Sequence, residues 1–194
     1  MSTGTMTPTE ADLHELTAAA LDAWTPGAPE TAGTVGTTDT GLAPTRSGLS
    51  LELPPRALDE AFGRGRIVRF EEWDLPHALT HEPTRRFLRE TGLPETAPGF
   101  TLDLDAPLRT PGEYIADEAD TQAILPPHAA RLLHLGTLPG AAHALLDGTT
   151  GKILRWTPTD GRVEVLETDI AAFAFTLWHS THPGLPDVPG LAGV

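Results

Sequence analysis

The chain has 194 residues, no cysteine and very few serines, and these shortages exclude several kinds of chemistry. Without cysteine there is no disulfide framework, no thiolate metal site and no thiol nucleophile. None of the serines stands in the Gly-x-Ser-x-Gly context of a hydrolase nucleophile. They are Ser2, Ser47, Ser50 and Ser180. We therefore expect no cysteine or serine enzyme, and we predict that the chain is not an enzyme.

Long apolar runs are also missing. No segment approaches the roughly 18 consecutive apolar residues that a membrane-spanning helix needs. The opening residues MSTGTMTPTE lack the basic and apolar regions of a signal peptide. With 39% hydrophobic residues the chain is long enough to bury one core. We expect a cytoplasmic protein with no membrane partner.

Basic residues are scarce, at 13 against 27 acidic ones, which gives a formal net charge of −14. The charge is −6 over residues 1–55, 0 over 56–90 and −8 over 91–194. Such a chain repels phosphate backbones, so we expect no direct binding of nucleic acid. Its natural complement is a basic protein, although maintenance of solubility accounts for the acidic balance equally well.

Metal and cofactor motifs are weak. His77 and His81 are four residues apart, as two ligands on one helical face would be, but prolines flank the segment and no third ligand is placed. GTTGKI at 148–153 lacks the spacing and the hydroxyl of a phosphate-binding loop, so it is interpreted as a β-turn. Asp147 before it is typical of an Asx turn. We predict no cofactor and no metal, and keep a hydrolase using His77 and His81 as a minor alternative.

The C-terminal half is rich in residues that specify a fold. Short apolar runs separated by glycine and proline predict adjacent strands, and Asp160-Gly161 predicts a tight hairpin. The four strands are expected near 132–135, 141–146, 153–157 and 163–166. Thr168 or Asp169 then caps a helix whose apolar residues recur with helical spacing up to Trp178. His134 and His143 fall in the strands and are interpreted as hydrogen-bonded core or edge histidines.

The upstream half alternates short elements with irregular segments. We predict helices over 56–62 and 83–91, strands over 66–70 and 102–104, and an irregular acidic loop at EEWDLP. Tyr114 and Ile115 are typical of the beginning of a strand, and the acidic residues 117–120 of a solvated turn. Thr7-Pro8-Thr9-Glu10 is a capping box that opens a helix through Trp24. The domain boundaries are 1–24 for this helix, 25–50 for a Thr/Gly/Pro-rich linker, 51–180 for the main domain and 181–194 for a tail.

These elements predict an α+β fold, with one central, mostly antiparallel sheet flanked by helices. The N-terminal helix is expected on a flexible linker. The order of motifs in the C-terminal half resembles the SUKH superfamily of bacterial immunity proteins, particularly its fourth group. The motifs are a strand pair that ends in Leu146-Asp147, a Thr-Gly-Lys turn, an Asp-Gly hairpin and a helix with Ala-x-Phe. PTRRFLRETGLP at 83–94 and IVRF at 67–70 resemble the same family.

The resemblance implies an immunity protein that binds a cognate polymorphic toxin, a basic nuclease or nucleic-acid deaminase, and neutralises it by steric and electrostatic occlusion. We expect a monomer or weak dimer. Acidic loops would accelerate association, and aromatic anchors would slow dissociation. The predicted partner-binding residues are Glu71, Glu72, Trp73, Asp74, Tyr114, Asp117, Glu118 and Asp120.

Two alternatives stay open at this point. Trp73 and Tyr114 can each fill the core instead of facing a partner. The whole chain can also be a non-catalytic adaptor or regulatory module, because related folds occur in cellular regulators. A toxin gene next to the gene of this chain would favour immunity.

Overall fold

The computed structural model describes residues 46–118 and 122–182. The predicted helix of residues 1–24, most of the linker and the tail beyond residue 182 lie outside the described part. So does Asp120, one of the predicted partner-binding residues. In the described part, no helix is long and apolar enough to cross a membrane.

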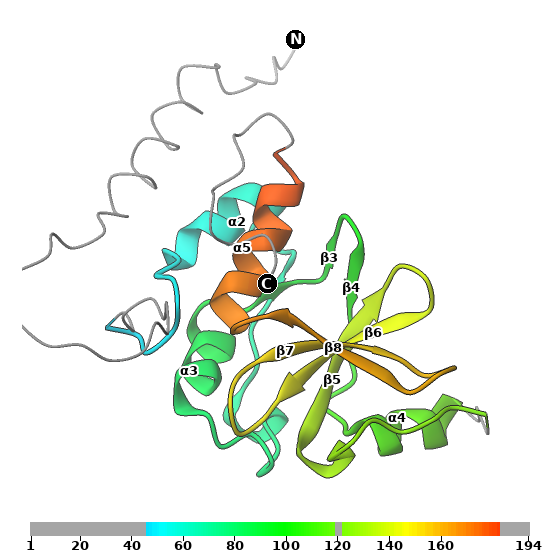
Figure 1. Ribbon diagram of the computed structural model, residues 1–194. Helices are drawn as coiled ribbons and strands as arrows, with labels where there is room; N and C mark the ends of the chain where they lie inside the picture. Colours follow the sequence, from blue (N-terminus) through cyan, green and yellow to red (C-terminus); the bar gives the residue numbers. More distant parts are fainter. Residues whose placement is uncertain (1–45, 119–121, 183–194) are drawn as a thin grey trace, which may run out of the picture. The chain divides into compact units, whose positions relative to one another are not determined.

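Helices and strands alternate at first and then separate into a run of strands and a last helix (Figure 1). The helices are α2 (Pro55–Phe62), α3 (Glu82–Glu90), α4 (Pro111–Glu118) and α5 (Ile170–Ser180), with 3₁₀ turns η1 (Glu72–Asp74) and η2 (Ala129–Arg131). The strands are β1 (Ile67–Val68), β2 (Leu93–Pro94), β3 (Thr96–Ala97), β4 (Phe100–Leu102), β5 (Leu132–Leu138), β6 (Ala142–Asp147), β7 (Ile153–Thr157) and β8 (Arg162–Glu167).

Strands β3 to β8 form one six-stranded sheet in sequence order, and every neighbouring pair is antiparallel. Strands β1 and β2 make a separate antiparallel pair. The predicted α+β class with a mostly antiparallel central sheet is confirmed. The predicted meander is confirmed as β5 to β8, and Asp160-Gly161 turns the chain between β7 and β8.

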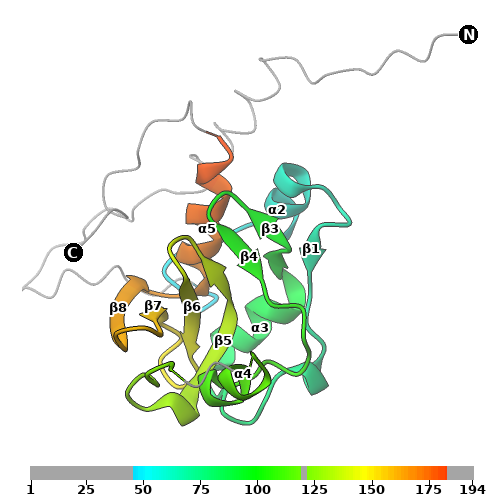
Figure 2. The same cartoon turned by 90° about the vertical axis from the view of Figure 1, so that its right-hand side faces the viewer.

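The sheet has a different cover on each face. Helices α2, α3 and α5 lie on one side of it and α4 lies on the other, as the two views show (Figures 1 and 2). Because side chains alternate along a strand, Leu133 and Leu146 join the large core under α5, whereas Leu132, Leu145 and Trp156 form a small second cluster. The face under α4 is therefore the less apolar one.

Helix α5 begins as predicted. The Asp169 carboxylate accepts hydrogen bonds from the backbone N–H groups of Ala171 and Ala172, each at 3.0 Å. This satisfies two donors that a helix start leaves unpaired, and it places a negative charge at the positive end of the helix dipole. The other Asp169 oxygen accepts from the backbone N–H of Ser50 at 2.5 Å, which fastens the start of the described chain to the start of α5.

Four predicted elements are corrected. The strand near 66–70 shortens to β1, and the strand near 102–104 ends at Leu102, leaving Leu104 56% exposed. Tyr114 and Ile115 lie in helix α4 instead of a strand. The acidic residues 117 and 118 end that helix instead of forming a turn. Pro111 stands at the first helical position, where its missing N–H costs nothing, and this favours a helix over a strand.

Candidate functional site

The acidic segment Glu71–Asp74 forms a short, rigid turn. The Asp74 carboxylate accepts a hydrogen bond from the backbone N–H of Glu71 at 2.8 Å, and the backbone N–H of Asp74 donates to the carbonyl of Glu71 at 3.0 Å. Trp73 lies between them and is 76% exposed, the highest value among the large hydrophobic residues of the described part. The alternative that Trp73 fills the core is therefore wrong.

Glu72 points toward the neighbouring helix instead of solvent alone. Its carboxylate pairs with the guanidinium groups of Arg85 and Arg89 on α3, the latter at 3.0 Å. Arg85 also donates to the backbone carbonyl of Leu79 at 2.8 Å. Glu72 therefore fastens the turn to α3, while Glu71 beside it stays exposed.

Helix α4 carries the second predicted acidic segment, and it starts with a reciprocal cap. The Glu113 carboxylate accepts from the Thr110 backbone N–H at 2.7 Å and from the Thr110 hydroxyl at 2.8 Å, and the Glu113 N–H faces that hydroxyl at 3.3 Å. The backbone bond from Thr110 is the main cause that lowers the pKa of Glu113. This capping box fixes the helix start and keeps Glu113 ionised.

Tyr114 turns toward the sheet. Its ring stacks on the ring of His134, with centroids 3.9 Å apart, and meets the ring of His143 edge-on at 5.2 Å. Tyr114 is partly buried, so the core alternative holds for this residue. Asp117, one helical turn further on, is 65% exposed. The structure places the backbone of Glu118 at the end of α4.

The first acidic segment adjoins the chain that leads into the second, although about 40 residues of sequence separate the two segments. The backbone N–H of Leu108 donates to the carbonyl of Asp74 at 3.0 Å, which joins the η1 turn to the approach of α4. A shallow hollow lies next to this junction. It is lined by Pro76, Pro107, Leu108, Arg109, Thr110, Glu113, Ala116 and Asp117. We name six side chains around this junction, all exposed except the half-buried Asp74, the η1–α4 surface: Glu71, Trp73, Asp74, Asp105, Glu113 and Asp117.

Arg109 lies at the centre of this surface and holds three carboxylates. Its guanidinium nitrogens lie 3.0 Å from Asp103, 2.9 Å from Asp105 and 2.7 Å from Asp117. Its Cζ atom also lies 5.3 Å from the centroid of the Tyr114 ring. The hydrogen bond to Asp103 is the main cause that raises the pKa of Arg109. The guanidinium thus stays charged, and it neutralises only part of the charge that surrounds it.

Below Arg109 a chain of hydrogen bonds runs into the sheet. Asp103 Oδ2 lies 2.8 Å from His134 Nδ1, and His134 Nε2 lies 3.0 Å from His143 Nδ1. A carboxylate only accepts, so a neutral His134 carries its proton on Nδ1 and accepts at Nε2 from His143. His134 is 1% exposed. The prediction of hydrogen-bonded core or edge histidines is thereby confirmed.

The environment of this chain shifts two pKa values. Burial, together with the neighbouring His134, lowers the pKa of His143 to about 4. Burial raises the pKa of Asp103, but hydrogen bonds from the Asp105 backbone, His134 and Arg109 outweigh it, and the net shift is downward. A neutral His143 and an ionised Asp103 are therefore the stable states near neutral pH.

Several residues of this arrangement are absent from the sequence prediction. They are Asp103, Asp105, Arg109 and Glu113. For Glu113 a signal exists in the sequence, because Thr-Pro-Gly-Glu at 110–113 repeats the capping pattern of Thr7–Glu10. Asp103, Asp105 and Arg109 are close in sequence, but their links to Asp117 on α4 and to His134 on β5 join other elements and leave no local signal.

The residues weighed as metal or catalytic groups have other roles. Asp147 accepts from the backbone N–H groups of Thr149 and Thr150 at 3.0 and 3.2 Å, which confirms the Asx turn. His77 is exposed in a turn, and His81 precedes α3 and bonds Thr84 at 2.8 Å, so the two histidines do not share a helical face. Over residues 46–118 and 122–182 there is no group of three or more His, Cys, Asp or Glu side chains arranged to hold a metal ion.

The fold defines a class: an α+β protein whose antiparallel meander has helices on both faces. A sequence model described as SUKH-4 immunity protein matches residues 53–183, about two thirds of the chain. The chain belongs to the SUKH-4 immunity protein family, as its sequence motifs predict. No curated protein and no solved structure matches it significantly.

Proposed function

We propose that this immunity protein binds a cognate polymorphic toxin through the η1–α4 surface and neutralises it by occlusion. The observation that carries the proposal is Trp73, 76% exposed on a turn that hydrogen bonds hold in place. An exposed tryptophan on a rigid turn gives a partner a large contact area at little cost in conformational entropy. Glu71, two residues before Trp73, is an exposed carboxylate, and Asp117, also exposed, lines the adjoining hollow.

The charge of this surface supports a basic partner. Nucleases and nucleic-acid deaminases are basic where they bind phosphates, so an acidic surface complements their substrate grooves. We therefore propose that the toxin acts on nucleic acid and that the immunity protein covers its groove. Rim carboxylates such as Glu71 would accelerate association, and Trp73 would slow dissociation. The mechanism is occupancy, without a catalytic step.

A rescue assay tests the proposal. Cells expressing the toxin encoded next to this chain should survive when the wild-type chain is co-expressed, and the purified chain should block nucleic-acid cleavage or deamination by that toxin. Trp73→Ala and Glu71→Lys should each reduce the rescue. Glu60→Lys, an equal charge change at an exposed position of α2, is the matched control and should rescue fully.

Two outcomes would count against the proposal. Full rescue by Trp73→Ala and Glu71→Lys together would move the toxin contact to another surface of the chain. Failure of the wild-type chain to rescue, together with stable binding to a host regulatory protein, would support an adaptor role instead.

A further inference from the structure

Arg109 has an unusual position for a residue of a binding surface. Its side chain is only 19% exposed, yet it contacts two carboxylates that are well exposed, Asp105 at 71% and Asp117 at 65%. Its third carboxylate, Asp103, is 13% exposed and belongs to the hydrogen-bonded chain that reaches His134. One half-buried cation thus connects two exposed anions to the hydrogen-bonded chain that reaches the buried His134.

Elementary electrostatics explains why such a connection is needed. Three carboxylates within hydrogen-bond reach of one point repel each other, and one guanidinium leaves a net charge of −2 on the group. Without the guanidinium, Asp105 and Asp117 would move apart into solvent. Arginine suits this position because its planar fork carries five N–H donors, whereas the lysine ammonium is a compact charge with three.

We propose that Arg109 is a positioning residue of the partner-binding surface, which fixes Asp105 and Asp117 against the Asp103–His134–His143 chain so that both carboxylates are preorganised for a basic partner. This inference rests on the proposed function and deepens it. Exposed ion pairs contribute little to stability. The restraint of the Asp105 and Asp117 side chains affects binding instead, because less conformational entropy is then lost when a partner binds them.

The net charge of the surface and the fixed positions of its carboxylates have opposite effects on toxin binding when Arg109 is replaced. Removal of the Arg109 charge makes the surface more negative, so an interface governed by net charge alone would bind a basic toxin faster and more tightly. An interface that depends on preorganised carboxylates would bind it more weakly in spite of the added negative charge. The two explanations therefore predict changes of opposite sign for the same variant.

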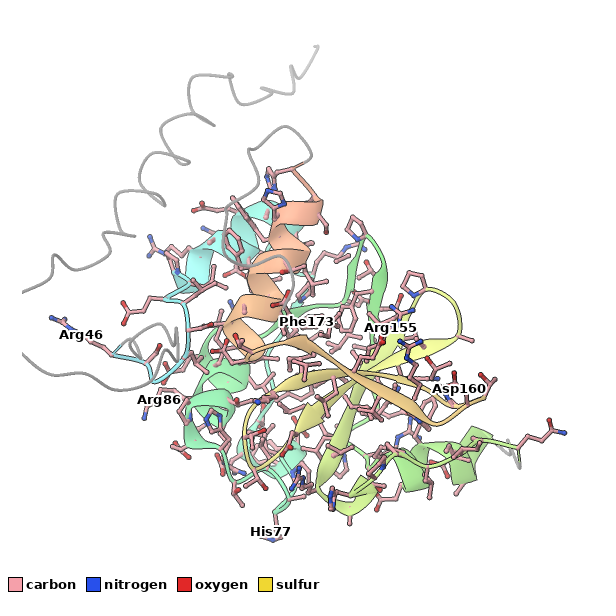
Figure 3. The ribbon with its side chains drawn as sticks, viewed as in Figure 1. Arg46, His77, Arg86, Arg155, Asp160 and Phe173 are labelled. Atoms are coloured by element: carbon pink, nitrogen blue, oxygen red, sulfur yellow. The ribbon has the colours of Figure 1, made fainter. Side chains whose placement is uncertain are left out.

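The test uses Arg109→Gln, which removes the charge, and Arg109→Lys, which keeps it but cannot reach three carboxylates. Arg86→Gln is the matched control, because Arg86 is an exposed residue of α3 on the other side of the sheet from α4 (Figure 3). Association and dissociation rates are measured with the toxin domain encoded next to this chain. A fluorinated tyrosine supplies a second readout, since Tyr114 is the single tyrosine of the chain and its ring lies under Arg109.

We expect complexes of both Arg109 variants to dissociate about tenfold faster, with association within about threefold of wild type, because most interface substitutions act on the dissociation rate. Arg86→Gln should leave the dissociation rate unchanged. The fluorine resonance of Tyr114 should shift in both Arg109 variants and stay in place in the control. If Arg109→Gln does not fold, as its melting temperature would reveal, Arg109→Lys alone decides.

Tighter binding by Arg109→Gln, or unchanged dissociation by Arg109→Lys, would overturn the inference. An unshifted Tyr114 resonance in both variants would overturn it as well, whichever toxin is used. If the wild-type chain does not bind the toxin at all, the proposed function fails, and the Tyr114 resonance still decides whether Arg109 fixes the side chains around it.

Discussion

The segments Glu71–Asp74 and Tyr114–Asp117 are alike in sequence and opposite in structure. Each sets one aromatic side chain among carboxylates. In the first, Trp73 stands 76% exposed on a 3₁₀ turn. In the second, Tyr114 stacks on His134 at 3.9 Å and faces the sheet. The aromatic residue is a contact for a partner in one segment and an interior contact in the other.

The difference shows what decides whether an aromatic side chain near acidic groups is exposed or packed against the sheet. Trp73 lies on a turn whose backbone is fixed by its own flanking residues and by the bond from Leu108. Tyr114 lies on the helix face that meets β5, where a histidine offers a ring of complementary shape. Acidic residues stand close to the aromatic residue in both segments, but the surface that the aromatic ring faces differs.

The largest expected effect concerns the interior segment. Tyr114→Ala should lower the free energy of unfolding by about 3 kcal/mol, because it removes a stacked ring and leaves a cavity between α4 and the sheet. Trp73→Ala should change it by less than about 0.5 kcal/mol, because the side chain is already in water. Urea denaturation followed by circular dichroism measures both. Equal losses of unfolding free energy in the two variants would show that Trp73 and Tyr114 do not differ in their contribution to stability.

The next effect concerns binding. Trp73→Ala should weaken the complex with the toxin by about 2 kcal/mol, roughly thirtyfold in Kd, as expected for a central aromatic anchor. Trp73→Phe should recover part of this loss, since it restores apolar contact area. Isothermal titration calorimetry gives the values, and an unchanged Kd for Trp73→Ala would remove this residue from the interface.

Acidification acts on the interior segment through His143. Its pKa is lowered to about 4 from the ordinary 6.5, so between these values the unfolded chain binds more protons than the folded one. The free energy of unfolding should therefore fall as pH decreases from about 6.5 toward about 4, by at most about 1.4 kcal/mol per pH unit. Asp103, whose pKa is lowered, extends the loss below that range.

Glu167 works in the opposite direction, because burial raises its pKa and its protonation favours the folded chain. Urea denaturation at pH 7, 6, 5 and 4.5 measures the net slope. His143→Gln should flatten it, since glutamine keeps a hydrogen-bond donor and does not titrate. A slope that persists in this variant would assign the pH dependence to other groups.

The smallest effect concerns the charges of the exposed segment. Glu71→Ala should weaken toxin binding by about 0.5–1 kcal/mol, mainly through slower association, and make the affinity less dependent on salt. Adding Glu72→Ala and Asp74→Ala should increase both effects, with some loss of order because these side chains also hold the turn. Stopped-flow association rates at 50 and 300 mM salt measure the slope, and an unchanged slope would exclude this turn from electrostatic steering.

Much of the fold follows from local patterns. The strands β5 to β8 are marked by apolar runs between glycine and proline turns, and α5 by its Asp169 cap and helical spacing. Helix α4 was predictable as well, because Thr110-Pro111 and Glu113 are the capping pattern that marks a helix start. Tyr114 and Ile115 favour a strand by propensity, but the capping pattern outweighs this preference.

The candidate site was predictable only in part. Runs of acidic residues draw attention to Glu71 and Asp117, but they do not reveal that the two segments adjoin. Nor do they reveal Arg109, whose partners lie at positions 103, 105 and 117. The pairing of Asp103 with His134 spans 31 residues of sequence, and only the close approach of the chain beyond β4 to β5 brings the two together.

The sequence by itself determined the α+β class, the C-terminal meander with its last helix, the acidic character and the family. These properties depend on periodicity, turn residues and charge, which act over a few neighbouring positions or over the whole chain. Tertiary structure alone decided that Trp73 is exposed, that Tyr114 is packed inward, and that Arg109 links two exposed carboxylates to the buried His134. Exposure and pairing depend on which distant residues share a surface, and local patterns carry no record of that.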